Sequence, residues 1–169
     1  MLCEKILSGG QTGVDRAALD VAIEKSVPYG GWAPHGRMAE DGPIPDYYAL
    51  TEVPLSMYAD LGYDPLDPKD HYRIRTFLNV RDADATLILV PEPTWRSAGT
   101  QLTINAARKA SKPCLLLHPA DPDREWRIDR WVRDQKIKTL NIAGPRASKA
   151  PNLYDDACEF LRAAVMIAR

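Results

Sequence analysis

The sequence predicts an α/β fold, in which a doubly wound parallel sheet of about five strands carries helices on both faces. Short apolar runs alternate with segments whose apolar residues recur at helical spacing, and this alternation is typical of such sheets. The run at residues 85–90 is apolar apart from Thr86, as expected for a central strand covered on both faces. A glycine-rich turn at residues 9–13 joins the first apolar run to the first helical pattern.

Size and composition predict one domain over residues 1–169. The chain is 45% hydrophobic with a net charge of −1, which is typical of a globular domain with its own core. Near-neutral charge and the absence of an apolar run of about 20 residues predict no nucleic-acid partner and no membrane partner. The first residues enter a strand without a signal-peptide pattern, so we expect a cytoplasmic protein.

The cysteines predict neither disulfides nor a metal site. Cys3, Cys114 and Cys158 are widely spaced, and the sequence contains no CxxC motif. Such spacing fits buried thiols in a reducing compartment better than a disulfide framework or a zinc site.

In the first half of the chain, apolar runs predict two strands separated by a helix. The helix starts near Val14 and ends at Pro28, because proline does not continue a helix. A loop rich in Gly and Pro and a long surface excursion with a short strand inside follow. The two strands, the loop, the excursion and its inner strand occupy residues 5–8, 27–33, 34–43, 44–69 and 50–53.

The second half repeats the alternation of strands and helices. Asp70 is a good N-cap for the helix at residues 71–81. The apolar spacing from Leu102 to Ala110 predicts a helix after Gly99 and Thr100. The remaining elements are strands at residues 85–90, 113–117 and 139–142 and helices at residues 123–135 and 152–168, the last starting at 152 or 153.

The loops after three predicted strands should meet at one edge of the sheet. They occupy residues 9–13, 34–43 and 95–100. Ligands of doubly wound sheets bind beyond the carboxyl ends of the strands, near the switch in strand order. We therefore expect one site to which several loops contribute.

The first loop is the principal candidate for an anion site. Its glycines would let backbone N–H groups approach a phosphate, and the following helix points its positive dipole end at the same place. An ordinary strand-to-helix turn is the alternative. The pattern is neither GxxxxGK[ST] nor GxGxxG, which argues against a P-loop hydrolase and a dinucleotide oxidoreductase. The candidate residues are Gly9, Gly10, Gln11, Thr12, Gly13 and Arg16.

Three further residue pairs are candidates for ligand contacts. Gly99 and Thr100 open a helix and could hold a second phosphate oxygen. Arg75 and Asn79 are four residues apart and share a helix face, where the guanidinium could clamp a phosphate. Gly36 and Arg37 could hold an anion in the second loop. The alternatives are an ordinary turn, a surface salt bridge and a solvated loop.

Four segments of the chain together resemble the molybdenum cofactor carrier family, in the circularly permuted YpsA-like branch of the SLOG Rossmann-like superfamily. They are SGGQTGVDRAALD, GWAPHGRMAEDG, RTFLNVRDADATLIL and AGTQLTINAARK. The resemblance is strong over residues 5–118 and weak beyond. It implies a single Rossmann-like SLOG domain that binds a phosphate-bearing, nucleotide-like small molecule. The molybdenum cofactor (molybdopterin) is the leading candidate, and a nucleotide is the alternative.

A more distant resemblance, to the LOG-type nucleotide phosphoribohydrolases, bears on catalysis. Arg75 lies where their arginine would fall, and Gly99-Thr100 matches the GT of their PGGxGTxxE loop, but Thr103 replaces its glutamate. No catalytic residue is therefore predicted, because a carboxylate assists glycosidic cleavage. Glu40, Asp41 or Glu52 could substitute for it.

The sequence thus favours a carrier or binding protein. A nucleoside-monophosphate-processing enzyme and a nucleotide-sensing module with a protein partner remain open. Two tryptophans in the helix at residues 123–135 could form a subunit contact, since aromatic residues favour interfaces. This predicts a homo-oligomer, a dimer or a tetramer, with core packing as the alternative.

Overall fold

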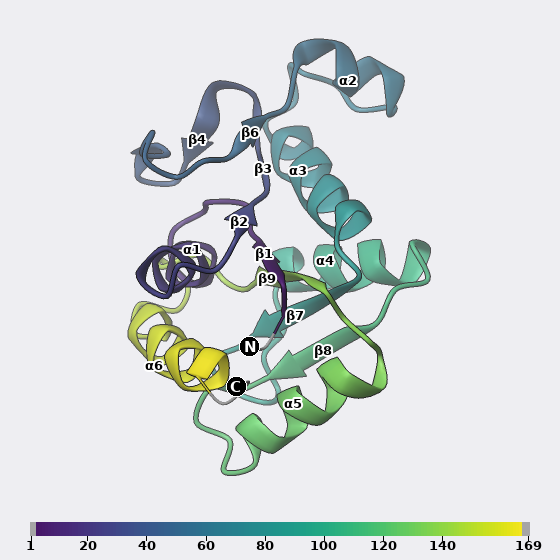
Figure 1. The fold of residues 1–169 in the computed structure, drawn as a ribbon. Coiled ribbons are helices and arrows are strands. Elements are labelled where there is room, and N and C mark those ends of the chain that lie inside the picture. The colour runs from purple at the N-terminus through teal and green to yellow at the C-terminus, as the bar shows by residue number, and fades with distance from the viewer. Residues whose placement is uncertain (1–2, 167–169) are drawn as a thin grey trace.

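A computed structural model describes residues 3–166 and shows a main sheet of five strands, all parallel (Figure 1). The strands lie in the order β2-β1-β9-β7-β8. Their bounds are Lys5–Leu7 for β1, Tyr29–Gly30 for β2, Ala85–Leu89 for β7, Cys114–Leu117 for β8 and Thr139–Ala143 for β9. The predicted α/β fold with a five-stranded parallel sheet is confirmed.

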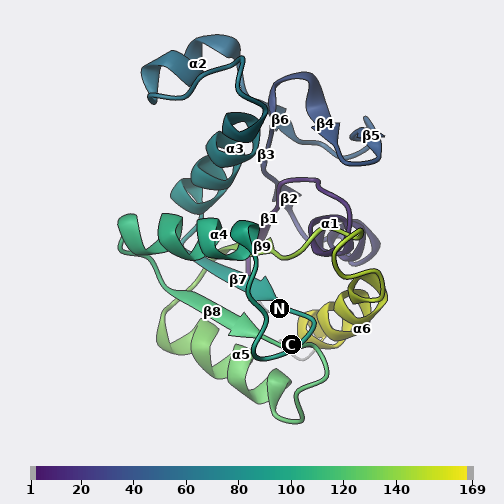
Figure 2. The same ribbon diagram turned by 180° about the vertical axis from the view of Figure 1, so that it is seen from behind.

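Residues 3–166 contain six α-helices. They are α1 (Val14–Glu24), α2 (Leu55–Asp60), α3 (Pro68–Asp82), α4 (Ala98–Lys109), α5 (Arg124–Asp134) and α6 (Leu153–Met166). Helix α6 contacts both α1 and α5 on one face, whereas α3 and α4 contact each other on the opposite face (Figures 1 and 2). Within residues 3–166, no helix is both long enough and apolar enough to cross a membrane. The predicted extension of the last helix to residue 168 lies outside the described residues.

The middle strand of the sheet is β9, and β7 lies beside it. The prediction that residues 85–90 form a central strand covered on both faces is confirmed, because β7 has a neighbour on each side and all of its residues are buried. In the structure, Leu140 of β9 pairs with Ile6 of β1 on one side and with Ala85 of β7 on the other. Along the chain, the strands of the two outer pairs, β1 with β2 and β7 with β8, therefore come before β9, which lies between the pairs. The switch in strand order falls at β9.

The main core fills the space between the sheet and the layer formed by α1, α5 and α6. Helix α1 contributes small side chains, including Ala17 and Ala18, which are fully buried. They let α1 approach the sheet and α6 closely, where Phe160 and Leu161 are also buried. The apolar residues that recur at helical spacing therefore form the buried face of α1.

The predicted second strand, residues 27–33, is divided at Gly31. Strand β2 belongs to the main sheet, whereas β3 (Trp32–Ala33) leaves it and pairs in parallel with β6 (Thr51–Glu52). Gly31 has φ 135°, and a Cβ there would lie 2.0 Å from the Ser8 carbonyl oxygen. Glycine thus permits both the change of direction and the close approach of the two backbones.

The loop at residues 34–43 and the excursion at residues 44–69 are more ordered than the sequence indicated, and the short strand predicted at residues 50–53 is present as β6. They contain the 3₁₀ turn η1 (His35–Arg37), the hairpin of β4 (Met38–Ala39) and β5 (Gly42–Pro43), strand β6 and helix α2. Helix α2 has six residues, too few for a clear periodic pattern. It is anchored by the buried Tyr58, whose hydroxyl accepts a hydrogen bond from the His35 N–H at 3.2 Å.

Helix α3 begins three residues earlier than expected. Its N-cap is Asp67, whose side chain accepts a hydrogen bond from the Lys69 N–H at 2.8 Å, and Pro68 occupies the first helical position. Proline suits that position because its missing N–H would have no partner in any case. Asp70, the expected cap, lies in the first turn and accepts a hydrogen bond from the Asp64 N–H at 2.8 Å.

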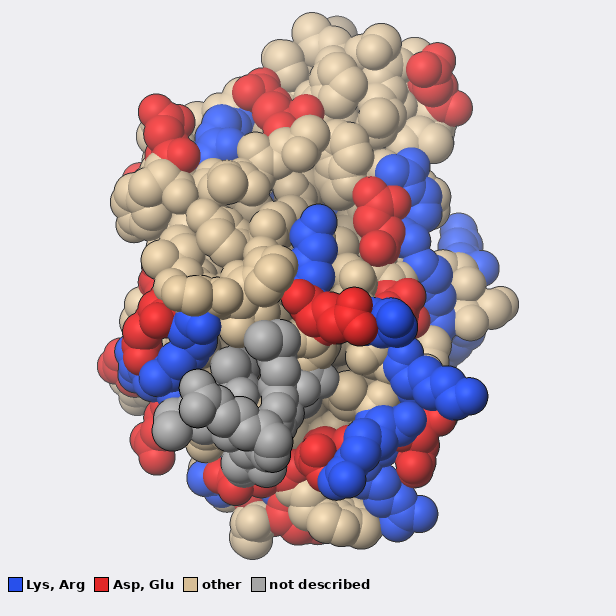
Figure 3. Space-filling view, in the orientation of Figure 1, with Lys and Arg blue, Asp and Glu red and all other residues tan. Residues whose placement is uncertain are grey.

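Acidic and basic side chains are interspersed on the face that carries α5 and α6 (Figure 3). Cys3, Cys114 and Cys158 are free. Of the two tryptophans of α5, Trp131 packs against the main core, whereas Trp126 remains 59% exposed. The predicted homo-oligomer stays a prediction.

We predict that Gly13→Ala destabilises the fold more than Gly62→Ala. Both glycines have positive φ, 84° and 78°, and Gly13 also has ψ −129°, outside the left-handed helical region. Backbone strain should therefore cost about 1 kcal/mol for Gly62→Ala and roughly 1 to 3 kcal/mol for Gly13→Ala. A Cβ at Gly13 would also lie 2.6 Å from the Pro145 carbonyl oxygen, whereas one at Gly62 meets nothing within 4 Å. Crowding should add roughly 1 to 3 kcal/mol for Gly13→Ala. Urea denaturation of both variants measures this difference, and equal losses would contradict it.

Candidate functional site

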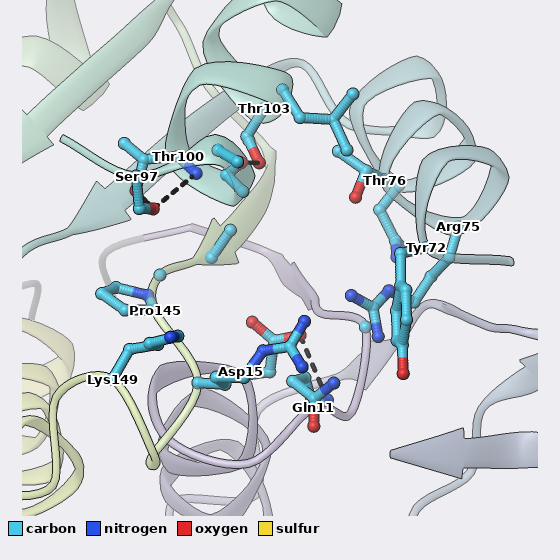
Figure 4. A pocket seen from close by; sticks show the side chains of 18 of the residues that line it. Gln11, Asp15, Tyr72, Arg75, Thr76, Ser97, Thr100, Thr103, Pro145 and Lys149 are labelled. Carbon is cyan, nitrogen blue, oxygen red and sulfur yellow. Dashed lines mark hydrogen bonds between the residues drawn. The ribbon is translucent and has the colours of Figure 1, made fainter. Parts of the chain in front are cut away.

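A pocket of about 380 Å³ opens at the carboxyl edge of the sheet (Figure 4). Its walls come from the loop after β1, from α3, from the N-terminal turns of α4 and from β9 with the loop that follows. The lining residues include Gly9, Gln11, Asp15, Tyr72, Arg75, Thr76, Asn79, Ser97, Ala98, Gly99, Thr100, Thr103, Asn141, Arg146 and Lys149. Six of these belong to the predicted site, namely Gly9, Gln11, Arg75, Asn79, Gly99 and Thr100.

Arg75 reaches the pocket from α3 and is the most deeply placed cation there. Its side chain lies against Gly9, where a Cβ would come within 2.8 Å of the Arg75 Nε atom. Burial lowers the pKa of this guanidinium, while the charge of Asp15 acts in the opposite direction. Arg75 is only 9% exposed, and among the described residues its buried Nη1 atom has no hydrogen-bond acceptor.

Gln11 presents a second buried donor to the same pocket. Its Oε1 atom accepts hydrogen bonds from the N–H groups of Thr12 and Glu40, both at 3.0 Å. These two bonds fix the orientation of the amide, so that oxygen and nitrogen are not interchangeable. The Nε2 atom is buried and has no acceptor within the described part of the chain. Two unsatisfied donors in one cavity call for an explanation, because native proteins rarely leave such groups unpaired.

Asp15 is the one carboxylate among the residues that line the pocket. It accepts a hydrogen bond from the Gln11 N–H at 3.2 Å. Burial raises its pKa to about 6, although the nearby Arg75 charge and backbone hydrogen bonds act in the opposite direction. Asp15 therefore titrates close to neutral pH, unlike an ordinary aspartate.

The N-terminus of α4 forms the opposite wall. Ser97 is the N-cap, and its Oγ atom accepts a hydrogen bond from the Thr100 N–H at 3.1 Å. Gly99 and Thr100 thus lie inside the first helical turn. The N–H groups of Ala98 and Gly99 have no intrahelical acceptor, as is general for first-turn amides. A Cβ at Gly99 would meet nothing within 4 Å, so its small size is not required by packing.

The loop after β9 supplies pocket residues that the sequence analysis missed. Arg146 and Lys149 line the pocket from this loop. The guanidinium carbon of Arg146 lies 5.3 Å from the ring centroid of Tyr72, and that of Arg75 lies 5.4 Å from the same centroid. Gly144-Pro145 directly after a strand was the available signal. A turn after a strand indicates pocket residues only when that strand lies near the middle of the sheet, as β9 does.

Asn79 lines the pocket, but its amide is already paired. Its Oδ1 atom accepts a hydrogen bond from the Trp32 N–H at 2.8 Å, and its Nδ2 atom donates to the Trp32 carbonyl at 3.1 Å. Asn79 thereby holds β3 against α3. Arg75 and Asn79, predicted to share a helix face, therefore differ in role. Arg75 is a cation of the pocket, whereas the amide of Asn79 is structural.

Six predicted site residues do not line the pocket: Gly10, Thr12, Gly13, Arg16, Gly36 and Arg37. Arg16 is paired with Asp41 through two hydrogen bonds of 2.5 and 2.7 Å. Arg37 donates to the carbonyl groups of Pro45, Tyr48 and Leu50. Arg16 therefore anchors the loop at residues 34–43, and Arg37 connects that loop to the excursion at residues 44–69.

The other four residues outside the pocket shape the surrounding loops. The Thr12 hydroxyl donates to Glu40 and accepts from the Ala147 N–H at 3.1 Å. The three glycines all have positive φ, which is 76° at Gly10, 84° at Gly13 and 78° at Gly36. Glycine suits these turns because it carries no Cβ.

None of the three acids proposed to replace the missing glutamate lines the pocket. Glu40 accepts hydrogen bonds from Thr12 and from Ser148. Burial alone would raise the pKa of Glu40, but these hydrogen bonds outweigh it and lower the pKa. Asp41 is paired with Arg16, and Glu52 accepts from the Gly36 N–H at 2.7 Å. At the glutamate position itself, Thr103 donates to the Gly99 carbonyl at 3.0 Å.

Fold and pocket together define a doubly wound, Rossmann-like α/β protein with its cavity at the switch in strand order. The chain belongs to the circularly permutated YpsA SLOG family, whose model matches residues 6–165. It is also similar to a solved structure from Syntrophus aciditrophicus SB, described as a "putative molybdenum carrier protein". The two chains are 41% identical, with a TM-score of 0.84, over 97% of this chain and 96% of the other. No curated protein matches the chain.

We predict that Asp15→Asn changes how stability depends on pH. The folded-state pKa of about 6 lies above the ordinary value of 3.8, so the folded state binds the proton more tightly. Its stabilising contribution is complete below pH 3.8 and is lost as the pH rises through 6. Relative to Asp15→Asn, the wild type should lose up to about 3 kcal/mol between pH ~4 and ~7. Urea denaturation across this range measures the difference, and parallel pH profiles would contradict a raised pKa.

Proposed function

We propose that this protein binds a phosphate-bearing, nucleotide-like small molecule in the pocket and acts as its carrier. The observation that carries this proposal is the pair of buried donors, Arg75 Nη1 and Gln11 Nε2, which have no acceptor among the described residues. A ligand with several acceptor oxygens would satisfy both donors at once. Leaving such groups unpaired costs roughly 1 to 3 kcal/mol each, and more when the group is charged.

The charge of the pocket supports an anionic ligand. Arg75, Arg146 and Lys149 line it, whereas Asp15 is the one acid among its lining residues. The first-turn N–H groups of Ala98 and Gly99 add positive potential, since helix N-termini favour anions. A volume of about 380 Å³ also falls within the usual range for small-molecule pockets.

The leading candidate for the cargo is molybdopterin, the molybdenum cofactor. The support is the similarity to a protein described as a "putative molybdenum carrier protein" and the match of a phosphate group to the buried donors. Within residues 3–166, no group of three or more His, Cys, Asp or Glu side chains is placed to hold a metal ion. The pocket offers Arg75 and Gln11 to the phosphate of such a cargo and Tyr72 to its ring. A nucleotide is the alternative cargo.

A thermal-shift screen would identify the ligand class. The panel comprises nucleoside 5′-monophosphates, unphosphorylated pterins and phosphorylated pterins. A ligand that binds the folded state raises the melting temperature by mass action. We expect phosphorylated compounds to stabilise the protein and unphosphorylated pterins to do so weakly. Stabilisation by none of the phosphorylated compounds would contradict the proposed function.

We predict that Arg75→Lys weakens binding of the best phosphorylated compound from this screen. Lysine keeps the charge but loses the planar fork of donors, so the loss should be roughly 1 to 3 kcal/mol. Isothermal calorimetry measures it. The matched control is Arg130→Lys, because Arg130 lies on α5 with a 63% exposed side chain. Unchanged affinity in Arg75→Lys would remove Arg75 from the binding site.

A second candidate is an enzyme that cleaves nucleoside monophosphates, and Asp15 is the observation that favours it. This carboxyl lies in the pocket with a pKa of about 6, a value suited to general acid–base catalysis. Against it, Thr103 occupies the position of the LOG-type glutamate and its hydroxyl is already bonded.

We predict that the protein releases free base from nucleoside monophosphates far more slowly than an ordinary enzyme turns over. Chromatography of a nucleotide panel incubated with purified protein measures this release. Turnover of about 1 s⁻¹ or faster would favour the enzyme. In that case Asp15→Asn should abolish it, while Glu40→Gln, altered outside the pocket, should retain it.

A further inference from the structure

Two arginines from distant parts of the chain share one aromatic ring in the pocket. Arg75 comes from α3 and Arg146 from the loop after β9, and their guanidinium carbons lie 5.4 and 5.3 Å from the Tyr72 ring centroid. Tyr72 is the one aromatic residue that lines the pocket. The ring attracts both cations, but it does not neutralise them.

The two guanidiniums repel each other, and their surroundings compensate this only in part. Burial is the main cause that lowers the pKa of Arg75, and the charge of Arg146 lowers this pKa further. Glu40 approaches the Arg146 Nε atom only to 3.9 Å, and its oxygens already accept hydrogen bonds from Thr12 and Ser148. Asp15 is the one acid that lines the cavity.

We propose that Arg75 and Arg146 form a clamp that selects a terminal phosphomonoester over a phosphodiester. The clamp rests on the proposed function and specifies the phosphate that the site accepts. A phosphomonoester carries a charge of about −1.5 to −2 near neutral pH and exposes three oxygens, whereas a diester carries one charge. Arginine forks bind such oxygens in pairs, so two guanidiniums match the monoester and exceed what a diester requires.

The ligand would therefore end at its phosphate in this pocket. A compound whose single phosphate is bridged on both sides, such as a dinucleoside monophosphate, would offer one charge fewer to the same two cations. Arg75 would supply the buried anchor, because it is only 9% exposed. Arg146 would supply the second charge from the rim, where its side chain is 39% exposed.

The test compares methyl phosphate with dimethyl phosphate, two probes without a ring. Binding is followed by ¹H–¹⁵N NMR titration at pH 8, where the monoester is doubly charged. We expect the wild type to prefer methyl phosphate by about tenfold, equivalent to ~1.4 kcal/mol. Arg146→Gln should reduce this preference to about twofold or less, mainly by weakening methyl phosphate binding. Arg130→Gln on α5 serves as the control and should retain the full preference.

A pH change gives a second readout of the same clamp. At pH 5 methyl phosphate is mostly singly charged, since its second pKa is near 6. The wild-type preference should then approach that of Arg146→Gln. Asp15 also titrates in this range, but its protonation affects both probes and largely cancels in their ratio. The other ionisable side chains near the two arginines are Lys149, which also lines the pocket, and Glu40, whose pKa is lowered, mainly by hydrogen bonds from Ser148 and Thr12 against the effect of burial.

The possible results are distinguishable. Equal affinity of the wild type for both probes would overturn the clamp, while the proposed function would stand. If Arg146→Gln retained the full preference for methyl phosphate, Arg146 would not be part of the clamp. Binding of neither probe, together with a failed nucleotide and pterin screen, would overturn the clamp and the proposed function together. Should Arg146→Gln lose its folded spectrum, Arg146→Lys replaces it, with an intermediate preference expected because charge is kept and the fork is lost.

Discussion

The insertion of β9 between β1 and β7 is the constraint on which the rest of the structure depends. Strand β9 forms parallel ladders with both neighbours, so the chain segments after β1, β7 and β9 converge at one edge. This convergence brings the glycine loop and the N-terminus of α4 to the same cavity as Arg146 and Lys149. Without β9 in the middle, these groups would belong to separate surfaces.

The sequence revealed those parts of the fold and site that depend on local chemistry. Apolar runs and helical spacing predicted each strand of the main sheet, because burial imposes those patterns directly. The glycine loop was recognisable because close backbone approach requires glycine, and Gly9 indeed lies where a Cβ would meet Arg75. Helix α2 and the division at Gly31 were missed, since six-residue and two-residue elements leave no period to detect.

The remaining site residues were not predictable because their roles depend on partners far away in the chain. Arg16 and Arg37 look like phosphate ligands in isolation. In the fold, however, Arg16 is paired with Asp41, and Arg37 donates hydrogen bonds to three backbone carbonyls. Arg146 looks like an ordinary loop residue until strand order places it beside Tyr72. Asp15 was part of the quoted glycine motif, but nothing in the sequence showed that it would be buried beside Arg75.

The pocket is lined by four stretches of chain that are remote in sequence, around residues 9–15, 72–79, 97–103 and 141–149. A molecule bound there would act as a non-covalent cross-link between them. Amide hydrogen exchange in all four segments would slow together when it binds, since local opening would first require the loss of its contacts. The same contacts would also slow the dissociation of such a molecule. Its residence time would therefore depend on how often the four segments open locally, as well as on its affinity.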